Sequence, residues 1–393
     1  MLKPLLKWPG GKSSEIDQFL PLIPEYDRYI EPFVGGGALF FRLNPEKAVI
    51  NDTSEYLMEL YRLVGEGDEE LHRILNLQCR TFSALQKVCA DHSQQLLDLF
   101  HIYEAALTAG IDIKALRPHL YLTDRIAMDE SVVSELILDR EEYAGVMAAS
   151  FEDKLIRTAI NHRKKPFSEA DLRENLITGF TSGYYLYQRN VFNEIAAGKI
   201  LPSRQLKTAN FYFIREYCYG SMFRYNKKGE FNIPYGGMSY NKKDLSDKTN
   251  RLFSPQMAAL LKRTEIYCED FETLLDHLEL TERDFLFLDP PYDTEFSDYE
   301  GHSFGKADQC RLADFLTATR AQFLLVIKNT EFIYNLYDGR FRIMAFENKY
   351  LYNMRSRNDR KAQHLIITNI PEGEVPWIRE NINISDVDAE YHA

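Results

Sequence analysis

The sequence predicts an α/β protein in which a helical insertion interrupts the sheet. Near both ends of the chain, short apolar segments alternate with helical patterns, as in sheets whose strands are joined by helices. Residues 66–198 instead place apolar side chains at three- and four-residue spacing, which predicts a run of helices. At 393 residues the chain is long for one compact unit. We therefore expect a discontinuous domain of residues 1–64 and 255–393 and an inserted domain of residues 65–254.

Two short strands are predicted near the N-terminus. Residues 28–37 predict a strand that ends in a Gly-rich turn, and residues 47–52 predict a strand that ends on Asp52, with a helix from Ser54. Glycines after a first strand let the backbone approach a ligand, although a plain tight turn accounts for them equally well. The glycines do not form G-x-G-x-x-G, which argues against a dinucleotide pyrophosphate. Asp52 favours the ligand interpretation, because a carboxylate there can accept both ribose hydroxyls of an adenosine-containing cofactor.

The hexapeptide K-W-P-G-G-K at residues 7–12 precedes these strands. Its Gly-Gly-Lys turn is typical of anion contact, and the carboxylate of the same cofactor is a suitable anion. The glycine spacing excludes a Walker-type phosphate loop.

The inserted domain ends in a motif rich in basic and aromatic residues. Within the helical run we expect breaks at residues 163–166 and at the turn of residues 181–183. The motif at residues 224–236 then predicts a β-hairpin in which Arg224 and Asn226 stand among aromatic side chains. Arg, Asn and Lys are the residues that contact base edges and phosphates, yet a hairpin with packed aromatics is the commoner reason for such a pattern. Upstream aromatic and Met side chains could wedge into a gap in stacked bases; these are Tyr217, Tyr219, Met222 and Phe223.

The distribution of charge is uneven. The chain carries a net charge of −12, yet residues 199–263 contain 13 Lys or Arg against four acids. A basic segment in an acidic chain fits a localised phosphate-contacting face, and a solvated charged surface fits it equally well.

The strand pattern resumes near residue 264. Residues 264–268 predict a strand that closes on Asp270, whose carboxylate could bind the cofactor's adenine amino group or cap a helix. Residues 285–288 form a continuous apolar run, which indicates a strand buried on both faces. Further elements are expected as a helix over 308–320 and strands over 323–327, 342–346 and 364–368.

The tetrapeptide D-P-P-Y at residues 289–292 directly follows the fully apolar strand. Ligand sites in open α/β sheets lie at the carboxyl ends of strands, so its position suits an active site. The Asp289 carboxylate and a backbone carbonyl freed by Pro290 can each accept one N–H bond from an amine whose lone pair is delocalised. Tyr292 offers a face on which an extruded base can stack. The alternative is a helix-capping Asp at a Pro-Pro turn.

Other classes of function are disfavoured. No stretch reaches the roughly 18 apolar residues that a membrane span needs, and no early run resembles a signal peptide. The cysteines show no C-x-x-C pair and no clustering with histidine, so we expect no metal and a reducing cytoplasm; they are Cys79, Cys89, Cys218, Cys268 and Cys310.

Taken together, the motifs resemble those of the Dam-type DNA adenine methyltransferases. The following occur in that family's order: K-W-P-G-G-K (7–12), E-P-F-V-G-G-G (31–37), N-D (51–52), Y-Q-R-N-V-F-N (187–193), R-Y-N-K-K-G-E-F-N-I-P-Y-G (224–236), D-P-P-Y (289–292) and, more loosely, the segment 352–369. The resemblance covers residues 1–64 and 184–370. It implies a Rossmann-like, S-adenosylmethionine-dependent methyltransferase domain with an inserted, mainly helical DNA-recognition domain. It also implies methyl transfer to N6 of an adenine flipped out of double-stranded DNA.

The resemblance also implies roles for individual residues. The cofactor site would be formed by Trp8, Lys12, Phe33, Gly35, Asp52 and Asp289, to which its place after a predicted strand adds Asp270. The target adenine would be held in the catalytic loop by Asp289 and Tyr292, to which the freed backbone carbonyl adds Pro290. DNA would be contacted by Lys7, Tyr219, Met222 and Arg224, and the hairpin motif adds Asn226. Lys7 and Arg224 match positions that contact guanines in members that read GATC, and Tyr219 matches the intercalating aromatic. GATC is therefore the expected target.

Two departures and two alternatives qualify this resemblance. Gly220 replaces a polar residue that often follows the intercalating aromatic, and the block from 65 to 183 is longer than usual. A methyltransferase acting on another amine or amide typically shows Asn in place of Asp289 and lacks the hairpin motif. A DNA-binding protein without catalysis would not need intact Asp289, Tyr292, Asp52 and Lys12. We expect a monomer in a bacterial or phage-infected cytoplasm, with a cognate restriction endonuclease as a candidate partner.

Overall fold

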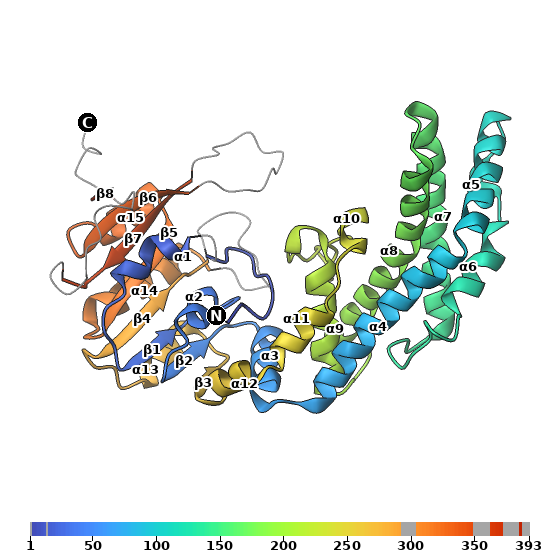
Figure 1. Ribbon diagram of the computed structural model, residues 1–393. Coiled ribbons are helices and arrows are strands. Elements are labelled where there is room, and N and C mark those ends of the chain that lie inside the picture. Colours follow the sequence, from blue (N-terminus) through green and yellow to red (C-terminus); the bar gives the residue numbers. More distant parts are fainter. Residues whose placement is uncertain (1, 13–14, 292–303, 349–361, 372–384, 387–393) are drawn as a thin grey trace. The chain divides into compact units, whose positions relative to one another are not determined.

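The computed structural model describes residues 2–12, 15–291, 304–348, 362–371 and 385–386. The chain divides into two compact units, residues 1–67 with 255–393 and residues 68–254 (Figure 1). Tyr292, which is predicted to belong to a catalytic loop, and much of the 352–369 segment lie outside the described residues.

The first unit is built on an eight-stranded sheet with the order β3-β2-β1-β4-β5-β7-β6-β8. The five strands from β3 to β5 pair in parallel, and β7 and β6 are antiparallel. The strands are β1 (Arg28–Glu31), β2 (Ala48–Asn51), β3 (Thr264–Tyr267), β4 (Asp284–Leu288), β5 (Gln322–Lys328), β6 (Arg342–Asn348), β7 (Ala362–Thr368) and β8 (Ser385–Asp386). The predicted α/β class, its mostly parallel sheet and the predicted strands are confirmed.

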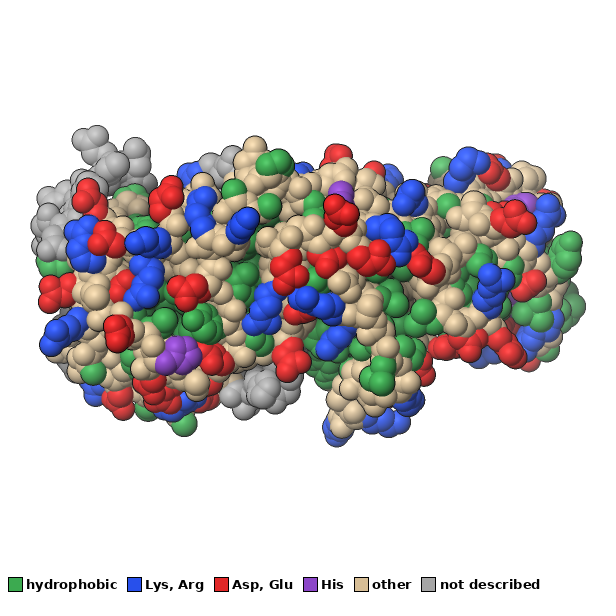
Figure 2. Space-filling view, turned by 90° about the horizontal axis from the view of Figure 1, so that it is seen from below, with side chains coloured by type: hydrophobic (Ala, Val, Ile, Leu, Met, Phe, Trp, Pro, Cys, Tyr) green, Lys and Arg blue, Asp and Glu red, His purple; other side chains and the backbone are tan. Residues whose placement is uncertain are grey.

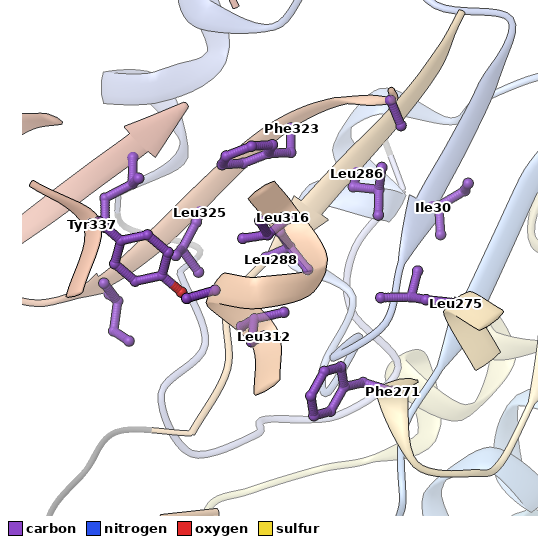
Figure 3. Packing of buried hydrophobic residues seen from close by; sticks show 14 of the residues in the cluster. Ile30, Phe271, Leu275, Leu286, Leu288, Leu312, Leu316, Phe323, Leu325 and Tyr337 are labelled. Carbon is purple, nitrogen blue, oxygen red and sulfur yellow. The ribbon is translucent and has the colours of Figure 1, made fainter. Parts of the chain in front are cut away.

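Strand β4 shows why this sheet is buried on both faces. Its side chains alternate, so Leu286 and Leu288 join a cluster with the helices α13 (Phe271–His277) and α14 (Lys306–Ala318) (Figure 3). On the opposite face, the ring of Phe287 stacks on Phe19 with centroids 5.5 Å apart. A continuous apolar run is therefore what this position requires.

The remaining helices of the first unit are short. They are α1 (Ile16–Phe19), α2 (Ala38–Leu43), α3 (Glu55–Glu66), α12 (Pro255–Lys262) and α15 (Glu331–Tyr337). Helix α3 begins where the sequence predicts, because the Ser54 hydroxyl accepts a hydrogen bond from the N–H of Leu57.

The second unit is mainly helical (Figure 1). Its helices are α4 (Glu69–Asp91), α5 (Ser93–Thr108), α6 (His119–Ala127), α7 (Arg140–Lys164), α8 (Glu169–Ala196), α9 (Arg204–Tyr217), α10 (Met238–Asn241) and α11 (Ser246–Leu252). Side-chain N-caps start four of the long helices, at Asp68, Asp139, Ser168 and Ser203. The predicted break at residues 163–166 is confirmed, since α7 ends at Lys164.

The predicted break at residues 181–183 is wrong, because this segment lies inside α8. Gly183 serves close packing rather than a turn: a Cβ there would lie 2.8 Å from the Met147 sulfur and 3.2 Å from the Met147 Cα. Gly179, one turn earlier, faces Phe151 in the same way. Small residues at this spacing let α7 and α8 approach closely, and the buried environment offsets their low helix propensity.

The motif at residues 224–236 forms an irregular hairpin rather than a regular ladder. Two isolated antiparallel bridges close it, Cys218 with Tyr235 and Tyr225 with Phe231. Asn226 shapes the tip, because its Oδ1 accepts hydrogen bonds from the N–H groups of Lys228 and Glu230 at 2.8 and 3.1 Å.

Candidate active site

A cavity of about 670 Å³ lies at the carboxyl ends of β1, β2, β3 and β4. It occupies the topological switch point of the sheet, where β2 and β4 leave β1 in opposite directions. Seven of the residues predicted for the cofactor site line it: Trp8, Lys12, Phe33, Gly35, Asp52, Asp270 and Asp289. Pro290 lines it as well. A cavity of this volume falls in the usual range for small-molecule sites, ~300–1,000 Å³.

The buried amide of Asn51 ties the strand ends together. Its Nδ2 donates to the carbonyls of Pro32 at 3.0 Å and Glu269 at 2.9 Å, and its Oδ1 accepts from the N–H of Glu269 at 2.9 Å. The loops after β1, β2 and β3 therefore share one anchor, which holds the rim of the cavity in place.

Lys12 and Asp289 form the central charge pair of the site. The Lys12 Nζ donates to Asp289 Oδ1 at 2.6 Å and to the Gly10 carbonyl at 3.1 Å, and the lysine side chain is only 2% exposed. Burial raises the pKa of Asp289, and the Lys12 ammonium opposes that rise. The Lys12 ammonium thus favours the ionised form of a carboxylate whose surroundings disfavour charge. Lys12 contacts the D-P-P-Y loop, and its contact to a bound anion stays a prediction.

Asp52 is held by the backbone around it. Its Oδ1 accepts from the N–H of Ser54 at 3.0 Å and its Oδ2 from the N–H of Gly35 at 3.1 Å. Burial raises the pKa of Asp52 to about 6, although these backbone bonds favour the charged form. Because a carboxylate oxygen can accept more than one hydrogen bond, Asp52 can also accept from a pair of neighbouring hydroxyls.

The Gly-rich turn lets Trp8 and the backbone pack closely. Gly35 has φ +46°, and a Cβ on it would lie 2.7 Å from the Trp8 Cδ1. Gly37 has φ +68°, and a Cβ on it would lie 2.6 Å from the Tyr61 hydroxyl, which donates to the Gly35 carbonyl at 3.0 Å. Glycine is therefore needed at both positions for conformation and for space.

Aromatic rings form one wall of the cavity. The Phe33 ring lies 5.4 Å from Phe271 and 5.5 Å, edge to face, from Phe304. Such a wall can hold a flat heterocycle by stacking.

Asp270 has the capping role that the sequence left open. Its Oδ1 accepts from the N–H of Glu272 at 3.0 Å, and both oxygens accept from Arg311, at 3.0 and 3.1 Å. Burial would raise the pKa of Asp270, but Arg311 and the backbone N–H groups of the capped helix together lower it. A contact to a ligand's amino group stays a prediction.

Sequence reasoning missed several residues that shape this site. Gln309 of α14 is fully buried and its Nε2 donates to the Pro291 carbonyl at 3.2 Å, which fastens the catalytic loop. Glu31 is buried at the cavity, accepts from the Tyr29 hydroxyl at 2.8 Å, and burial raises its pKa well above the ordinary value. Phe304 and Arg311 come from the segment after the D-P-P-Y loop. Only Glu31 carried a signal, as a polar residue at the end of an apolar strand.

The predicted DNA-contacting residues do not fall in one unit. Lys7 is exposed in the first unit, whereas the other four belong to the second. Tyr219 is 54% exposed and Arg224 is exposed, while Met222 is half-buried. The side chain of Asn226 is engaged within the hairpin tip and also donates to Glu230 Oε2 at 2.9 Å. Asn226 therefore has a role in the turn, and its contact to DNA stays a prediction.

Part of the basic segment is structural rather than free surface. Lys243 and Lys248 pair with the buried Glu216, at 2.9 and 2.5 Å, and outweigh its burial to lower its pKa. Arg215 is fully buried against the Phe223 ring. On the face in view in Figure 2, acidic and basic side chains are interspersed rather than gathered in one field. The count of basic residues therefore overstates the surface available for phosphate contact.

The described residues contain no group of three or more His, Cys, Asp or Glu side chains that could hold a metal ion. Among them there is also no helix long and apolar enough to cross a membrane.

Comparisons with known proteins point in one direction. A family model described as D12 class N6 adenine-specific DNA methyltransferase matches residues 8–178 and 170–352. The chain is 25% identical to the Type II methyltransferase M.CviBI of Paramecium bursaria Chlorella virus NC1A, over 94% of this chain and 100% of that protein. It is 26% identical to the Type II methyltransferase M.MjaIII of Methanocaldococcus jannaschii, over 90% and 94% of the two chains. It is 23% identical to the DNA adenine methylase of Haemophilus influenzae, over 86% and 83%.

Proposed function

The chain belongs to the D12 class of N6 adenine-specific DNA methyltransferases, and on that premise we propose that it moves a methyl group from S-adenosylmethionine to N6 of an adenine flipped out of duplex DNA. The observation that carries the proposal is the Lys12–Asp289 pair, which sets a lysine ammonium against the carboxylate of the D-P-P-Y loop inside the strand-end cavity.

The cavity suits S-adenosylmethionine in its donor set. Asp52 has lone pairs for the two ribose hydroxyls, and the aromatic wall at Phe33 can take an adenine ring. Gly35 and Gly37 leave space in the site, because a Cβ at either position would clash with Trp8 or Tyr61. When bound, the cofactor supplies an electrophilic methyl group.

Asp289 raises the nucleophilicity of N6. Its carboxylate accepts one N6–H bond, and a carbonyl of the Pro290–Pro291 loop accepts the other, which favours a pyramidal nitrogen. Positive charge that develops on the amine is stabilised by this preorganised acceptor in a water-poor site. Lys12 favours the ionised form of Asp289 and holds its Oδ1, which orients the acceptor before the substrate arrives.

The second unit is proposed to read the DNA. Arg224 is exposed at the start of the hairpin and can make a bidentate contact to a guanine, and the exposed Tyr219 can insert beside the flipped base. With Lys7, these positions favour GATC as the target. We propose a monomer, and a cognate restriction endonuclease stays a prediction.

Methyl transfer is tested directly with purified protein and labelled S-adenosylmethionine. We expect label in N6-methyladenine of a GATC duplex and far less in a duplex with the same bases scrambled. Mapping N6-methyladenine in the DNA of an expressing, methylation-free host gives the target without assuming it. Absence of label in any duplex would overturn the proposed activity, and label at another motif would overturn GATC alone.

A further inference from the structure

The hairpin at residues 224–236 has little pairing of its own, and one face of helix α8 supplies what it lacks. Three side chains spaced four residues apart reach the backbone of the hairpin's return segment, residues 231–233; we call them the α8 stripe, and they are Tyr185, Arg189 and Asn193. The spacing places them on a single helix face, one above the other.

Asn193 acts as a substitute strand. Its Nδ2 donates to the Phe231 carbonyl at 3.1 Å, and its Oδ1 accepts from the Phe231 N–H at 2.8 Å. Both backbone groups of Phe231 are thus satisfied by one amide, in the reciprocal pattern that a neighbouring strand provides.

The other two residues of the α8 stripe hold the next carbonyls. The Tyr185 hydroxyl donates to the Ile233 carbonyl at 2.9 Å. The Arg189 Nη1 lies 3.3 Å from the Ile233 carbonyl and 3.4 Å from the Asn232 carbonyl and donates to both. The return segment is therefore held at three successive residues.

This grip extends to Arg224. The N–H of Asn232 donates to the Arg224 carbonyl at 3.4 Å, so the segment that α8 holds also holds the backbone of Arg224. Beside it, the Phe223 ring is buried 4.6 Å from Phe231 and lies under the Arg215 guanidinium, 4.4 Å away. Phe223 is buried in this cluster, whereas its neighbour Arg224 is exposed.

We propose that the α8 stripe is a set of positioning residues that sets where Arg224 meets a base, and hence how strictly the enzyme reads its target. The inference rests on the proposed function, in which Arg224 contacts a guanine. Tyr185, Arg189 and Asn193 act through the hairpin backbone and belong to specificity rather than to methyl transfer. An arginine reads a base edge well only when its backbone is fixed, since its fork must align with two acceptors.

The test compares Asn193→Asp with Asn161→Asp. The first change keeps the size and the acceptor for the Phe231 N–H, but sets an oxygen against the Phe231 carbonyl. Asn161 is an exposed asparagine of α7 and serves as the matched control. Methylation rates are measured on the preferred duplex and on duplexes with one base pair changed, with KM for DNA and kcat separated.

We expect the ratio of preferred to altered duplex to fall about tenfold in Asn193→Asp, with kcat at saturating DNA nearly unchanged and Asn161→Asp equal to wild type. Tyr185→Phe removes a single donor and should lower the ratio severalfold, so it serves if Asn193→Asp does not fold. An equal loss on all duplexes, with an unchanged ratio, would show a purely structural role and overturn the inference. Wild-type protein that methylates no duplex would instead overturn the proposed function.

Discussion

The strand-end cavity and the hairpin differ in how their charged side chains are exposed and held. In the cavity, the buried Lys12 is bonded at 2.6 Å to Asp289, whose side chain is 17% exposed. At the hairpin, Arg224 is exposed, and the bonds that matter are made by its backbone and by the α8 stripe behind it. In the proposed function, the first arrangement prepares an electrostatic environment for a reaction, and the second presents a group to a partner. The difference teaches that a reaction site holds the charged groups themselves in place by direct bonds. A site that recognises a partner instead holds the backbone that carries an exposed charged side chain.

The largest loss of activity is expected from a change at Asp289. Asp289→Asn keeps the volume and an acceptor for Lys12 but removes the negative charge, so methylation of every duplex should fall at least ~100-fold, in line with loss of one preorganised group. Labelled methyl incorporation measures the rate, and Asp276→Asn, an exposed change on α13, is the control. Near-wild-type incorporation, or a loss confined to one target sequence, would contradict the proposed catalytic role.

The hairpin should fail in a different manner. Arg224→Ala removes a base contact, so discrimination at one base pair should fall by ~1–3 kcal/mol while the rate on the best duplex changes less. Lys227→Ala, at the exposed tip, is the companion variant and should weaken binding evenly and reduce its salt dependence. Binding and methylation across a panel of single-base variants distinguish the two. An unchanged preference in Arg224→Ala would refute the role of Arg224.

The smallest effect is expected from the pH dependence of Asp52. Burial raises its pKa to about 6, and only the charged form accepts both ribose hydroxyls. Affinity for S-adenosylmethionine should therefore fall about tenfold between pH 8 and pH 5, as the carboxylate takes up a proton. Calorimetric titration measures this loss, and Asp52→Asn should bind weakly at every pH.

The raised pKa of the Asp52 carboxylate should also make the stability of the fold depend on pH. Because the pKa is higher in the folded chain than its ordinary value of 3.8, the protonated form favours folding. Its stabilising contribution is complete below that value and is lost as the pH rises through about 6. Thermal unfolding without cofactor should show this loss in wild type and not in Asp52→Asn. A wild-type curve without it would mean that the pKa of Asp52 is not raised.

Local sequence signals were sufficient for most elements of the first unit. The apolar run of β4 and the helix start at Ser54 depend on residues within a few positions of each other, and the predicted strand and helix are confirmed. The prediction of a turn at residues 181–183 was wrong, because Gly183 is required for close packing against Met147 on another helix. Propensity could not reveal that partner.

In the candidate site, too, some features follow from local sequence and others only from tertiary contacts. That polar residues follow apolar strands, and so gather at one edge of a parallel sheet, was predictable for Asp52 and Asp289 from the sequence by itself. That Lys12 bonds to Asp289 across 277 residues, or that Gln309 and the α8 stripe hold two functional loops, was decided only by the tertiary structure. The physical reason is range: periodicity, caps and turns arise between near neighbours, whereas an ion pair or a substitute strand depends on which distant segments the sheet order and helix packing bring together.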